Sequence, residues 1–519
     1  MHQLWQALVY RRINSFGQST SAGSELDRKK RISTCEAQLH DGTHYHQFKQ
    51  TSVIKALDYA HDAAKAWIEG LDARPVAARA TLSQLRNRFR HALPETGMKA
   101  EEVIRWIAEN ANDGMLGSAG GRFFAWVIGG GLESALAADW LVATWDQNAA
   151  LYACGPAVAV IEEEAGEWIK SLLDLPREAS FAFTTGCQLA HVTSLAAARY
   201  AVLKRANWDV ENDGLFGAPR VTIMTNEQKH GSVERAVRYL GFGRASFMSL
   251  QTDDAGRVMP QALKRALAKA TGPVIVILNA ADLNVGACDP FAKLIPVAKQ
   301  AGAWVHIDGA FGLFARASRR HRAQLEGVEQ ADSWVTDGHK WLNVPFDCGI
   351  AIVRDCDAHR AAMTVSASYV AAEESARDQI DWNPEWSRRA RGVPVYAALK
   401  ELGRQGVESM VDRCCAHCHA LVTGIGALAG AEVVASANLN QGLIRFWKRG
   451  QTPEQDDAFT DEVIQRINTT GEAFFSGTTW RGRRAMRVSV VNWRTCARDV
   501  ERAIAAVRSV LAAIDTSAD

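Results

Sequence analysis

Seven short runs rich in β-branched and aromatic residues alternate with helical stretches between residues 176 and 400. Strands that alternate with helices in this way imply a sheet that is largely parallel and is covered by helices on both faces. We therefore predict an α/β fold with a mostly parallel seven-stranded sheet. The predicted strands are Phe181–Thr185, Val221–Met224, Phe247–Leu250, Val274–Asn279, Trp304–Ile307, Ser333–Thr336 and Gly349–Val353.

The 519-residue chain is long enough for several structural parts. Its first residues are polar and weakly periodic, which predicts a poorly ordered extension. An N-terminal helical segment follows, with apolar residues at helical spacing in Ser52–Leu71 and Val76–Leu93. After the α/β domain, helices and strands such as Leu443–Phe446 and Met486–Val491 predict a small C-terminal α+β domain. The predicted limits of the four parts are residues 1–50, 51–175, 176–400 and 401–519.

The composition is that of an ordinary globular protein, with 47% hydrophobic and 23% charged residues. The formal net charge of +1 gives no reason to expect nucleic acid or an acidic membrane surface as a partner. The longest apolar run, Ala149–Ile161, is too short to span a bilayer and contains Gly155-Pro156. With no secretory signal pattern, the ten cysteines indicate reduced thiols and a cytoplasmic location.

One cysteine cluster has the spacing of a haem-attachment motif. Cys415, Cys418 and His419 form a C-x-x-C-H pattern inside Val407–Leu428. Most of that stretch has the periodicity of an amphipathic helix, so we predict a helix of the small domain and no metal site.

The most informative pair of residues for chemistry is Asp308 and Lys340. Asp308 follows the predicted strand Trp304–Ile307, and Lys340 comes 32 residues later, just past Ser333–Thr336. A lysine amine forms a Schiff base with the aldehyde of pyridoxal 5'-phosphate (PLP). A buried aspartate holds the pyridine nitrogen of that cofactor protonated, which makes the ring an electron sink. The pair therefore indicates PLP chemistry.

Two further places are compatible with the same cofactor. The turn from Thr184 to Gln188 follows a strand and precedes the helical run Leu189–Leu203. Backbone N–H groups at such a helix start can bind a phosphate, although many turns of this kind contain glycine and threonine. His230, at the start of another helix, is either a cofactor contact or a capping residue.

Together these motifs resemble those of the group II PLP-dependent amino-acid decarboxylases, over about residues 55–510. The block from His339-Lys340-Trp341-Leu342 to Phe346-Asp347-Cys348 is close to the family signature, and His306-x-Asp308-x-Ala310 precedes it at the expected separation. The resemblance implies the fold type I architecture of PLP-dependent transferases. It also implies a homodimer whose active sites lie at the subunit interface.

The resemblance assigns a role to each matching residue. Lys340 would carry the Schiff base, with His339 beside it, and Asp308 would pair with the pyridinium nitrogen. His230 would stack on one face of the ring and Ala310 would pack on the other. The phosphate-side positions are occupied by Gly186, Cys187, Gln188 and Asp337.

The chain departs from the family pattern at several points. Cys187 and Gln188 stand where the phosphate turn often has a hydroxyl, and the acidic Asp337 would repel a phosphate. Residues 280–286 replace a stretch rich in glycine and threonine. In the segment Tyr369–Arg388, which matches the mobile catalytic loop, the only tyrosine lies at the very start. The donor of the proton to the substrate α-carbon is therefore unassigned, with His230 and His339 as candidates.

The reaction implied is decarboxylation of an L-amino acid to its amine through Schiff-base and quinonoid intermediates. Phe123, Phe124 and Trp126 match the family's substrate pocket and favour an aromatic or bulky substrate, although a packed core segment explains them equally well. Arg122 and Arg487 are alternative contacts for a substrate carboxylate. An aldehyde synthase, a transaminase and a non-catalytic homologue remain as alternatives.

Overall fold

The computed structural model of the protein describes residues 54–364 and 376–516, with side chains as far as residue 514. The chain forms two compact units. The first comprises Met1–Gly70 with Arg79–Gly114, and the second comprises Leu71–Ala78 with Met115–Asp519. The predicted extension of residues 1–50 and Tyr369 lie outside the described residues.

The first unit is helical. Residues 54–69 form one helix, within the predicted Ser52–Leu71, and α3 (Leu82–Phe89) and α4 (Ala100–Ala111) follow. The predicted helix Val76–Leu93 was too long. It begins only at Leu82, where Thr81 caps it by exchanging hydrogen bonds with Gln84.

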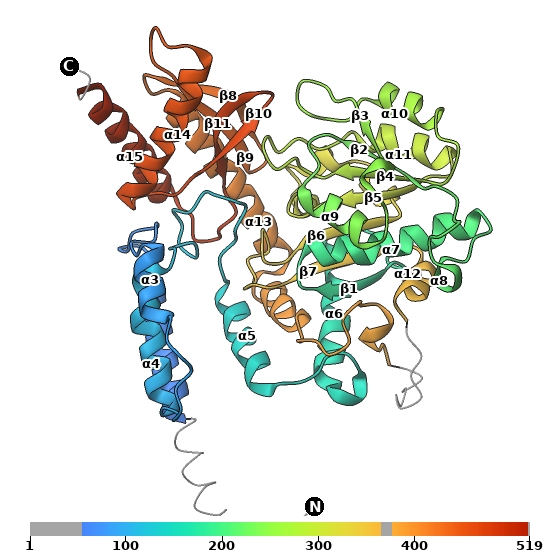
Figure 1. The fold of residues 1–519 in the computed structure, drawn as a ribbon, viewed down its shortest axis with the longest axis horizontal. Helices are drawn as coiled ribbons and strands as arrows, with labels where there is room; N and C mark the ends of the chain where they lie inside the picture. The colour runs from blue at the N-terminus through green and yellow to red at the C-terminus, as the bar shows by residue number, and fades with distance from the viewer. Residues whose placement is uncertain (1–53, 365–375, 517–519) are drawn as a thin grey trace, which may run out of the picture. The chain divides into compact units, whose positions relative to one another are not determined.

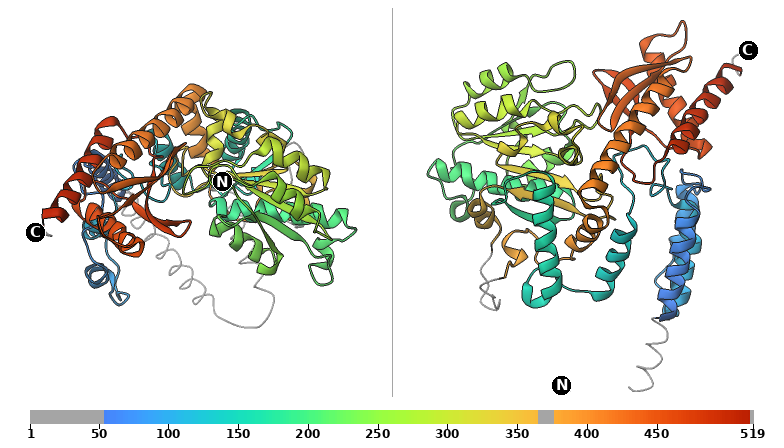
Figure 2. Two further views of the ribbon diagram at one scale, coloured as in Figure 1. Left: turned by 90° about the horizontal axis from the view of Figure 1, so that it is seen from above. Right: turned by 180° about the vertical axis from the view of Figure 1, so that it is seen from behind.

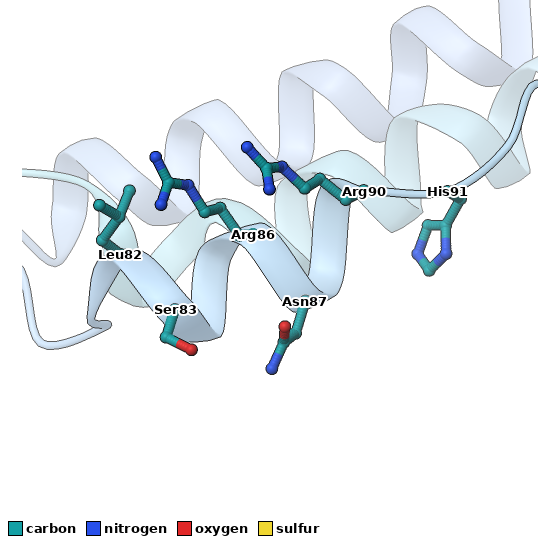
Figure 3. A pocket seen from close by; sticks show the side chains of 6 residues that line it. All are labelled: Leu82, Ser83, Arg86, Asn87, Arg90 and His91. Atoms are coloured by element: carbon teal, nitrogen blue, oxygen red, sulfur yellow. The ribbon is translucent and has the colours of Figure 1, made fainter.

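Two features of the flanking chain explain the shorter helix. Val76 and Gly471 both belong to the second unit, and the N–H of Val76 is bonded to the carbonyl of Gly471. The N–H groups of Arg79 and Ala80 both bond to Asp113 O. These bonds hold the backbone before α3 in a non-helical path. A shallow pocket lies on α3, where Arg86 and Arg90 extend to one side and Asn87 and His91 to the other (Figure 3). None of the predicted cofactor residues lines it.

The second unit is built on a seven-stranded sheet (Figure 1). The spatial order is β1-β7-β6-β5-β4-β2-β3, and only β7 runs antiparallel to its neighbours β1 and β6. The strands are β1 (Ser180–Thr184), β2 (Thr222–Asn226), β3 (Phe247–Leu250), β4 (Val274–Asn279), β5 (Trp304–Asp308), β6 (Ser333–Asp337) and β7 (Gly349–Val353). The predicted mostly parallel sheet is confirmed, with each predicted strand within two residues of its observed limits.

Helices cover both faces of this sheet, as the views in Figures 1 and 2 show. On one face Ile275 and Ile277 of β4 pack under three helices. These are α7 (Cys187–Arg205), α9 (Gly231–Tyr239) and α12 (Cys356–Met363). On the other face Val276 and Leu278 join the largest core cluster with residues of α6 (Pro156–Leu172), α10 (Pro260–Leu267) and α11 (Phe291–Gln300). The burial of β4 on both faces therefore reflects a three-layer fold.

A long helix connects the large sheet to a second, smaller one. Helix α13 (Gly392–Gly426) is interrupted at Gly403, whose φ is +58°, and packs against α5 (Glu133–Trp145) and α6. The remaining elements are α8 (Val210–Asp213), β8 (Ala431–Asn438), β9 (Gln441–Phe446), α14 (Pro453–Thr470), β10 (Ser476–Trp480), β11 (Arg483–Ser489) and α15 (Ala497–Thr516). Their strands form an antiparallel sheet in the order β10-β11-β9-β8, as predicted for an α+β region.

The predicted strand Met486–Val491 was misplaced at both ends, because the observed β11 covers Arg483–Ser489. The predicted limits of the four parts stay predictions, and residue 400 lies within α13, just before the interruption at Gly403.

The cysteine motif lies within α13, as predicted. Cys415 and Cys418 are buried in the core, and burial raises the pKa of both thiols above its ordinary value, so both are neutral. Across residues 54–364 and 376–516, no group of three or more His, Cys, Asp or Glu side chains is arranged to hold a metal ion. No helix in those ranges has the length and hydropathy needed to cross a membrane.

Candidate active site

The predicted cofactor residues gather at one edge of the large sheet, where β1, β5 and β6 end and α7 and α9 begin (Figure 1). Asp308 is the last residue of β5, and Asp337 is the last residue of β6. Gly186 joins β1 to α7, and His230 caps the start of α9. The carboxyl end of a parallel sheet is the usual place for a ligand in such folds.

Lys340 and Asp337 form an ion pair at the centre of this edge. Lys340 Nζ lies 3.0 Å from Oδ2 of Asp337, a carboxylate that is almost fully buried. Burial alone would lower the pKa of Lys340, but the nearby Asp337 and the other negative groups outweigh it and raise that pKa above its ordinary value. The amine is therefore held as an ammonium.

Asp337 also caps the helix that follows β1. Its Oδ1 accepts a 2.6 Å hydrogen bond from the backbone N–H of Cys187, the first residue of α7. His339 Nε2 lies 3.7 Å from Oδ2 of the same carboxylate, and its Nδ1 accepts a hydrogen bond from Cys348 N. Burial lowers the pKa of His339, so this imidazole is neutral near pH 7. Asp337 thus joins Lys340, His339 and the start of α7.

A glycine makes this convergence possible. Gly186 has a φ of +143°, a backbone conformation that L side chains rarely adopt. A Cβ atom at this position would also lie only 3.3 Å from Cε1 of His339. The turn before α7 can therefore approach His339 and Asp337 closely.

Asp308 is the second buried carboxylate of the site. Its Oδ1 accepts a hydrogen bond from Ala310 N at 3.2 Å, and its Oδ2 faces Nε2 of His191 at 3.6 Å. Although burial would raise the pKa of Asp308, the neighbouring His191, His230 and Lys340 lower it below its ordinary value. Asp308 is therefore an anion next to the lysine, as an electron-sink partner must be.

A side-chain hydrogen bond connects the start of α7 to the start of α9. Gln188 donates from Nε2 to the carbonyl of Ser232 at 3.3 Å. His230 Nδ1 accepts from the N–H of Ser232 and lies 2.7 Å from the hydroxyl of Ser232. The Nδ1 side of the ring therefore caps α9, which is one of the two alternatives considered for this residue. The residue as a whole is exposed, but desolvation of the ring and the nearby Lys340 still lower its pKa. Among the described residues no hydrogen bond to its Nε2 is present, and a contact of this ring with the cofactor stays a prediction.

Phe123, Phe124 and Trp126 lie apart from this cluster of charges. Phe123 stacks on Phe474 with ring centroids 5.1 Å apart, and Phe124 stacks on Phe475 at 5.2 Å. Phe123 and Phe124 are fully buried, which fits the packed-core alternative, whereas Trp126 is 51% exposed. A role of these residues in binding substrate stays a prediction.

A close backbone contact nevertheless connects this segment to the lysine. A Cβ atom at Gly129 would lie only 2.1 Å from the carbonyl oxygen of Lys340, so only glycine fits there. The backbone just after the aromatic segment therefore lies against the backbone of Lys340, at Gly129.

The two arginines considered for a substrate carboxylate differ in their surroundings. Arg122 donates to four backbone carbonyls, those of Asp72, Arg74, Gly471 and Glu472, so its guanidinium has a structural role. Arg487 is buried on β11 and bonds Ser489 Oγ. Desolvation lowers the pKa of Arg487 to about 10, with Asp282 acting against it.

The sequence reasoning missed His191. This buried residue lies one helical turn after Cys187 on α7, so spacing from the predicted phosphate turn was the available signal. What the sequence could not give was its contact with Asp308, a residue 117 positions later.

The family is decided by comparison with known proteins. The model of the pyridoxal-dependent decarboxylase conserved domain matches residues 83–449. The chain belongs to this family. Pyridoxal-dependent decarboxylases use PLP, so PLP is the cofactor of this enzyme, and the enzyme is a PLP-dependent amino-acid decarboxylase.

Relatives of the decarboxylase cover most of its length. An aromatic-L-amino-acid decarboxylase of Bacillus atrophaeus is 26% identical over 458 residues, which are 86% of this chain and 93% of the relative. An L-2,4-diaminobutyrate decarboxylase of Rhizobium meliloti is 26% identical over 74% of this chain and 76% of its own. The crystal structure of Oryza sativa TDC with PLP and tryptamine superposes with a TM-score of 0.83 and 23% identity, covering 89% of this chain and 98% of that chain. This similarity confirms the predicted fold type I architecture.

The residues of the decarboxylase fit PLP. Lys340 supplies the amine and Asp308 a buried anion, and each influences the pKa of the other, which indicates that both charges lie in one enclosure. The start of α7 offers a helix N-terminus for the phosphate. Because the N–H of Cys187 is bonded to Asp337, the phosphate contacts of Cys187 and Gln188 stay predictions.

Proposed function

We propose that the enzyme decarboxylates an aromatic or other bulky L-amino acid to its amine, with Lys340 as the residue that binds PLP covalently. The observation that carries this proposal is the pair of buried carboxylates that act on one lysine amine: Asp337 lies 3.0 Å from it, and Asp308 contributes to raising its pKa. Asp337 controls the protonation of Lys340, and Asp308 would pair with the nitrogen of the cofactor ring.

The cofactor, when bound, supplies an aldehyde for amines and a ring that accepts the electron pair left by carbon dioxide. Asp308 holds the ring nitrogen protonated, which requires that its carboxylate remain ionised. His191, His230 and Lys340 support this by lowering the pKa of Asp308 despite its burial. Ala310, whose N–H bonds Asp308, is small enough to leave room beside it.

Lys340 must lose a proton before its nitrogen can attack an aldehyde. Asp337 Oδ2, at 3.0 Å, is the acceptor within hydrogen-bond reach. His339 Nε2 lies 3.7 Å from that oxygen, and because Nδ1 accepts from Cys348 N, the neutral ring carries its proton on Nε2 and directs it toward the carboxylate. Asp337 therefore acts on the lysine, a role that also removes the objection to an acidic group facing a phosphate.

The proton for the substrate α-carbon comes from His339 or His230. His339 is supported by its place beside Lys340 and by its neutral ring, which carries its proton on Nε2 because Nδ1 accepts from Cys348 N. His230 is supported by the Nε2 of its ring, to which no hydrogen bond is present among the described residues.

The substrate class rests on two observations. One relative is named as an aromatic-L-amino-acid decarboxylase. The half-exposed Trp126 also packs at 5.4 Å from Phe474, which gives the segment leading to Lys340 an aromatic surface. Aromatic rings of this kind favour a flat apolar substrate side chain.

A homodimer is part of the proposal. Several large apolar side chains of the first unit are exposed in the single chain, including Ile54, Leu57, Leu82 and Leu93. Apolar groups gathered in one unit are typical of a surface that another chain covers. Active sites shared between subunits and a cytoplasmic location remain proposals from the family resemblance and from the sequence.

The decisive experiment uses purified, PLP-loaded protein with a panel of amino acids in deuterated water, followed by mass spectrometry of the products. We expect an amine that carries one deuterium on its α-carbon, from an aromatic amino acid. The Lys340→Ala variant is the control and should yield no amine. An aldehyde with peroxide, or a keto acid, would replace the decarboxylase proposal with an oxidative or transaminating one.

A further inference from the structure

A buried row of polar side chains leads from Trp304 to Asp308. Trp304, His306 and Asp308 alternate along β5 and so point to the same face of the sheet. His191 comes from α7 above that face, and Ser333 comes from β6, where it pairs with His306. His191, His306 and Ser333 are completely buried.

Four contacts connect these side chains in a line. Trp304 Nε1 donates to Ser333 Oγ at 2.9 Å, and Ser333 Oγ lies 2.8 Å from His306 Nδ1. His306 Nε2 lies 2.9 Å from His191 Nδ1. The last contact, from His191 Nε2 to Asp308 Oδ2, is longer, at 3.6 Å. This distance is longer than a hydrogen bond, and in the part of the chain that the structure describes His191 Nε2 has no hydrogen-bond partner.

The direction of the hydrogen bonds follows from the Asp308 end. An ionised carboxylate only accepts, so the facing Nε2 of His191 must carry a proton. In a neutral His191, Nδ1 is then an acceptor and must receive the proton of His306 Nε2. His306 Nδ1 in turn accepts from the Ser333 hydroxyl, and Ser333 Oγ accepts from Trp304, whose indole nitrogen can only donate. One set of neutral tautomers therefore satisfies the three hydrogen bonds of the row and directs the Nε2–H of His191 toward Asp308.

A cationic His191 satisfies fewer of them. Both of its nitrogens would donate, so His306 would have to donate from Nδ1 to Ser333. Ser333 Oγ would then accept from His306 and Trp304 together, and its own proton would have no acceptor among the described residues. An unsatisfied donor in a fully buried site costs about 1–3 kcal/mol.

Burial lowers the pKa of His306 well below its ordinary value, so His306 is a neutral member of the row. The end of the row therefore presents the neutral Nε2–H of His191, rather than a second charge, to the Asp308 carboxylate. Such a donor stabilises the ionised form of a carboxylate and fixes its orientation.

We propose that His191 is a positioning residue of the decarboxylase, which acts through a directional hydrogen-bond row from Trp304 to hold Asp308 as an oriented anion for the ring nitrogen of PLP. This inference rests on the proposed function, because Asp308 has this use only if PLP binds at Lys340. His191 itself touches Asp308 and His306 and need not touch the cofactor or the substrate.

The first test compares three variants for the Kd of PLP and for the protonation of its ring nitrogen, observed by NMR with ¹⁵N-labelled PLP. His191→Leu removes the donor and should weaken PLP binding about 10- to 100-fold and shift the nitrogen signal toward the unprotonated position. His191→Gln keeps an N–H that can reach Asp308 and should recover most of both. Ser194→Ala is the matched control, since Ser194 is equally buried on α7 and lies outside the row.

A second measurement needs no variant at the site and covers the case in which His191→Leu does not fold. In protein with ¹⁵N-labelled histidine, both His191 and His306 should appear as neutral rings protonated at Nε2. A cationic His191, or either ring protonated at Nδ1, would overturn the proposal.

The outcomes separate this inference from the proposed function. Normal PLP affinity and a protonated ring nitrogen in a folded His191→Leu protein would refute the role of His191 and leave the decarboxylase proposal intact. Unaltered protein that forms no covalent link between PLP and Lys340 would refute the proposed function, and the positioning role with it.

Discussion

Lys340 Nζ lies 3.0 Å from Oδ2 of Asp337, so the lysine that must attack an aldehyde is held as an ammonium by a buried carboxylate. The same carboxylate accepts the N–H of Cys187 and lies near His339. Asp337 therefore determines three things at once: the proton of Lys340, the start of α7, and the path by which the proton can leave. The first two predictions below follow from this arrangement.

Replacing Lys340 should separate its chemistry from its charge. We expect Lys340→Ala and Lys340→Arg both to lose the covalent attachment of PLP, and turnover to fall by at least about 1000-fold, as for the loss of a covalent nucleophile. Borohydride reduction and mass spectrometry would detect the attachment. The arginine variant keeps a cation for Asp337 and should stay close to the native unfolding temperature, whereas the alanine variant should not. Attached PLP in either variant would show that another lysine carries it.

Replacing Asp337 should shift the pH at which apo-protein takes up PLP. Asp337 raises the pKa of Lys340 against the effect of burial, so in Asp337→Asn the pKa should fall and the neutral amine should be present at lower pH. The rate of covalent attachment, measured as a function of pH, should therefore move to lower pH. An unchanged profile would mean that Asp337 does not control the lysine proton.

The same variant should lose stability at neutral pH. A lysine whose pKa is raised in the folded state contributes stability that is present below its unfolded pKa and is lost as pH rises through the folded value. Asp337→Asn should therefore unfold about 3 kcal/mol more easily at pH 7 in urea, as expected for breaking a buried ion pair. Asp254→Asn is the matched control, because that carboxylate is fully exposed and pairs only at the surface.

The aromatic segment offers a third prediction, because its residues differ in burial. Phe124 is fully buried against Phe475, so Phe124→Ala should destabilise the fold by about 3–5 kcal/mol. Trp126 is 51% exposed, so Trp126→Ala should cost little stability and should instead raise the KM for an aromatic substrate. Urea denaturation and steady-state kinetics would distinguish the two. A Trp126→Ala enzyme with unchanged KM for every substrate would remove this residue from the substrate site.

The local sequence predicted the individual strands of the large sheet well, but it predicted strand pairing and the N-terminal helix less well. Strands such as β4 are short β-branched runs buried on both faces, and that signal is contained within a few residues. The antiparallel insertion of β7 between β1 and β6 is a long-range pairing that no local pattern encodes. The helix expected from Val76 failed for a similar reason, since the carbonyl of Gly471 takes its N–H.

The same contrast between local patterns and long-range contacts applies to the active site. The identities of Lys340 and Asp308 could be read from motifs, because their chemistry depends on residue type at a fixed spacing. The role of Asp337 could not, because it depends on Cys187, 150 positions earlier in the chain. His191 was missed entirely, although it lies on the predicted helix, because its role depends on contacts with Asp308 and His306, which lie on β5.

A fourth prediction concerns the response of the fold to acid. His359 is completely buried between Ser180 Oγ, at 2.8 Å from its Nδ1, and the carbonyl of Trp382, at 2.9 Å from its Nε2. Burial, and then the nearby Arg377, lower the pKa of His359 to about 3. The imidazole is therefore neutral in the folded protein and becomes charged on unfolding below its ordinary pKa.

The sign of the effect follows directly. Between the ordinary pKa of histidine, about 6.5, and the folded value, the unfolded chain binds the extra proton, so stability falls as pH falls. His359 alone should contribute about 2 kcal/mol of loss between pH 6.5 and pH 5, at about 1.4 kcal/mol per pH unit. Urea denaturation at both pH values should show that loss in the native enzyme. His359→Gln should be less stable at pH 6.5 but lose about 2 kcal/mol less on acidification, whereas His419→Gln, at an exposed position of α13, should follow the native slope. An identical slope in the His359→Gln protein would show that this buried imidazole is not a source of acid sensitivity.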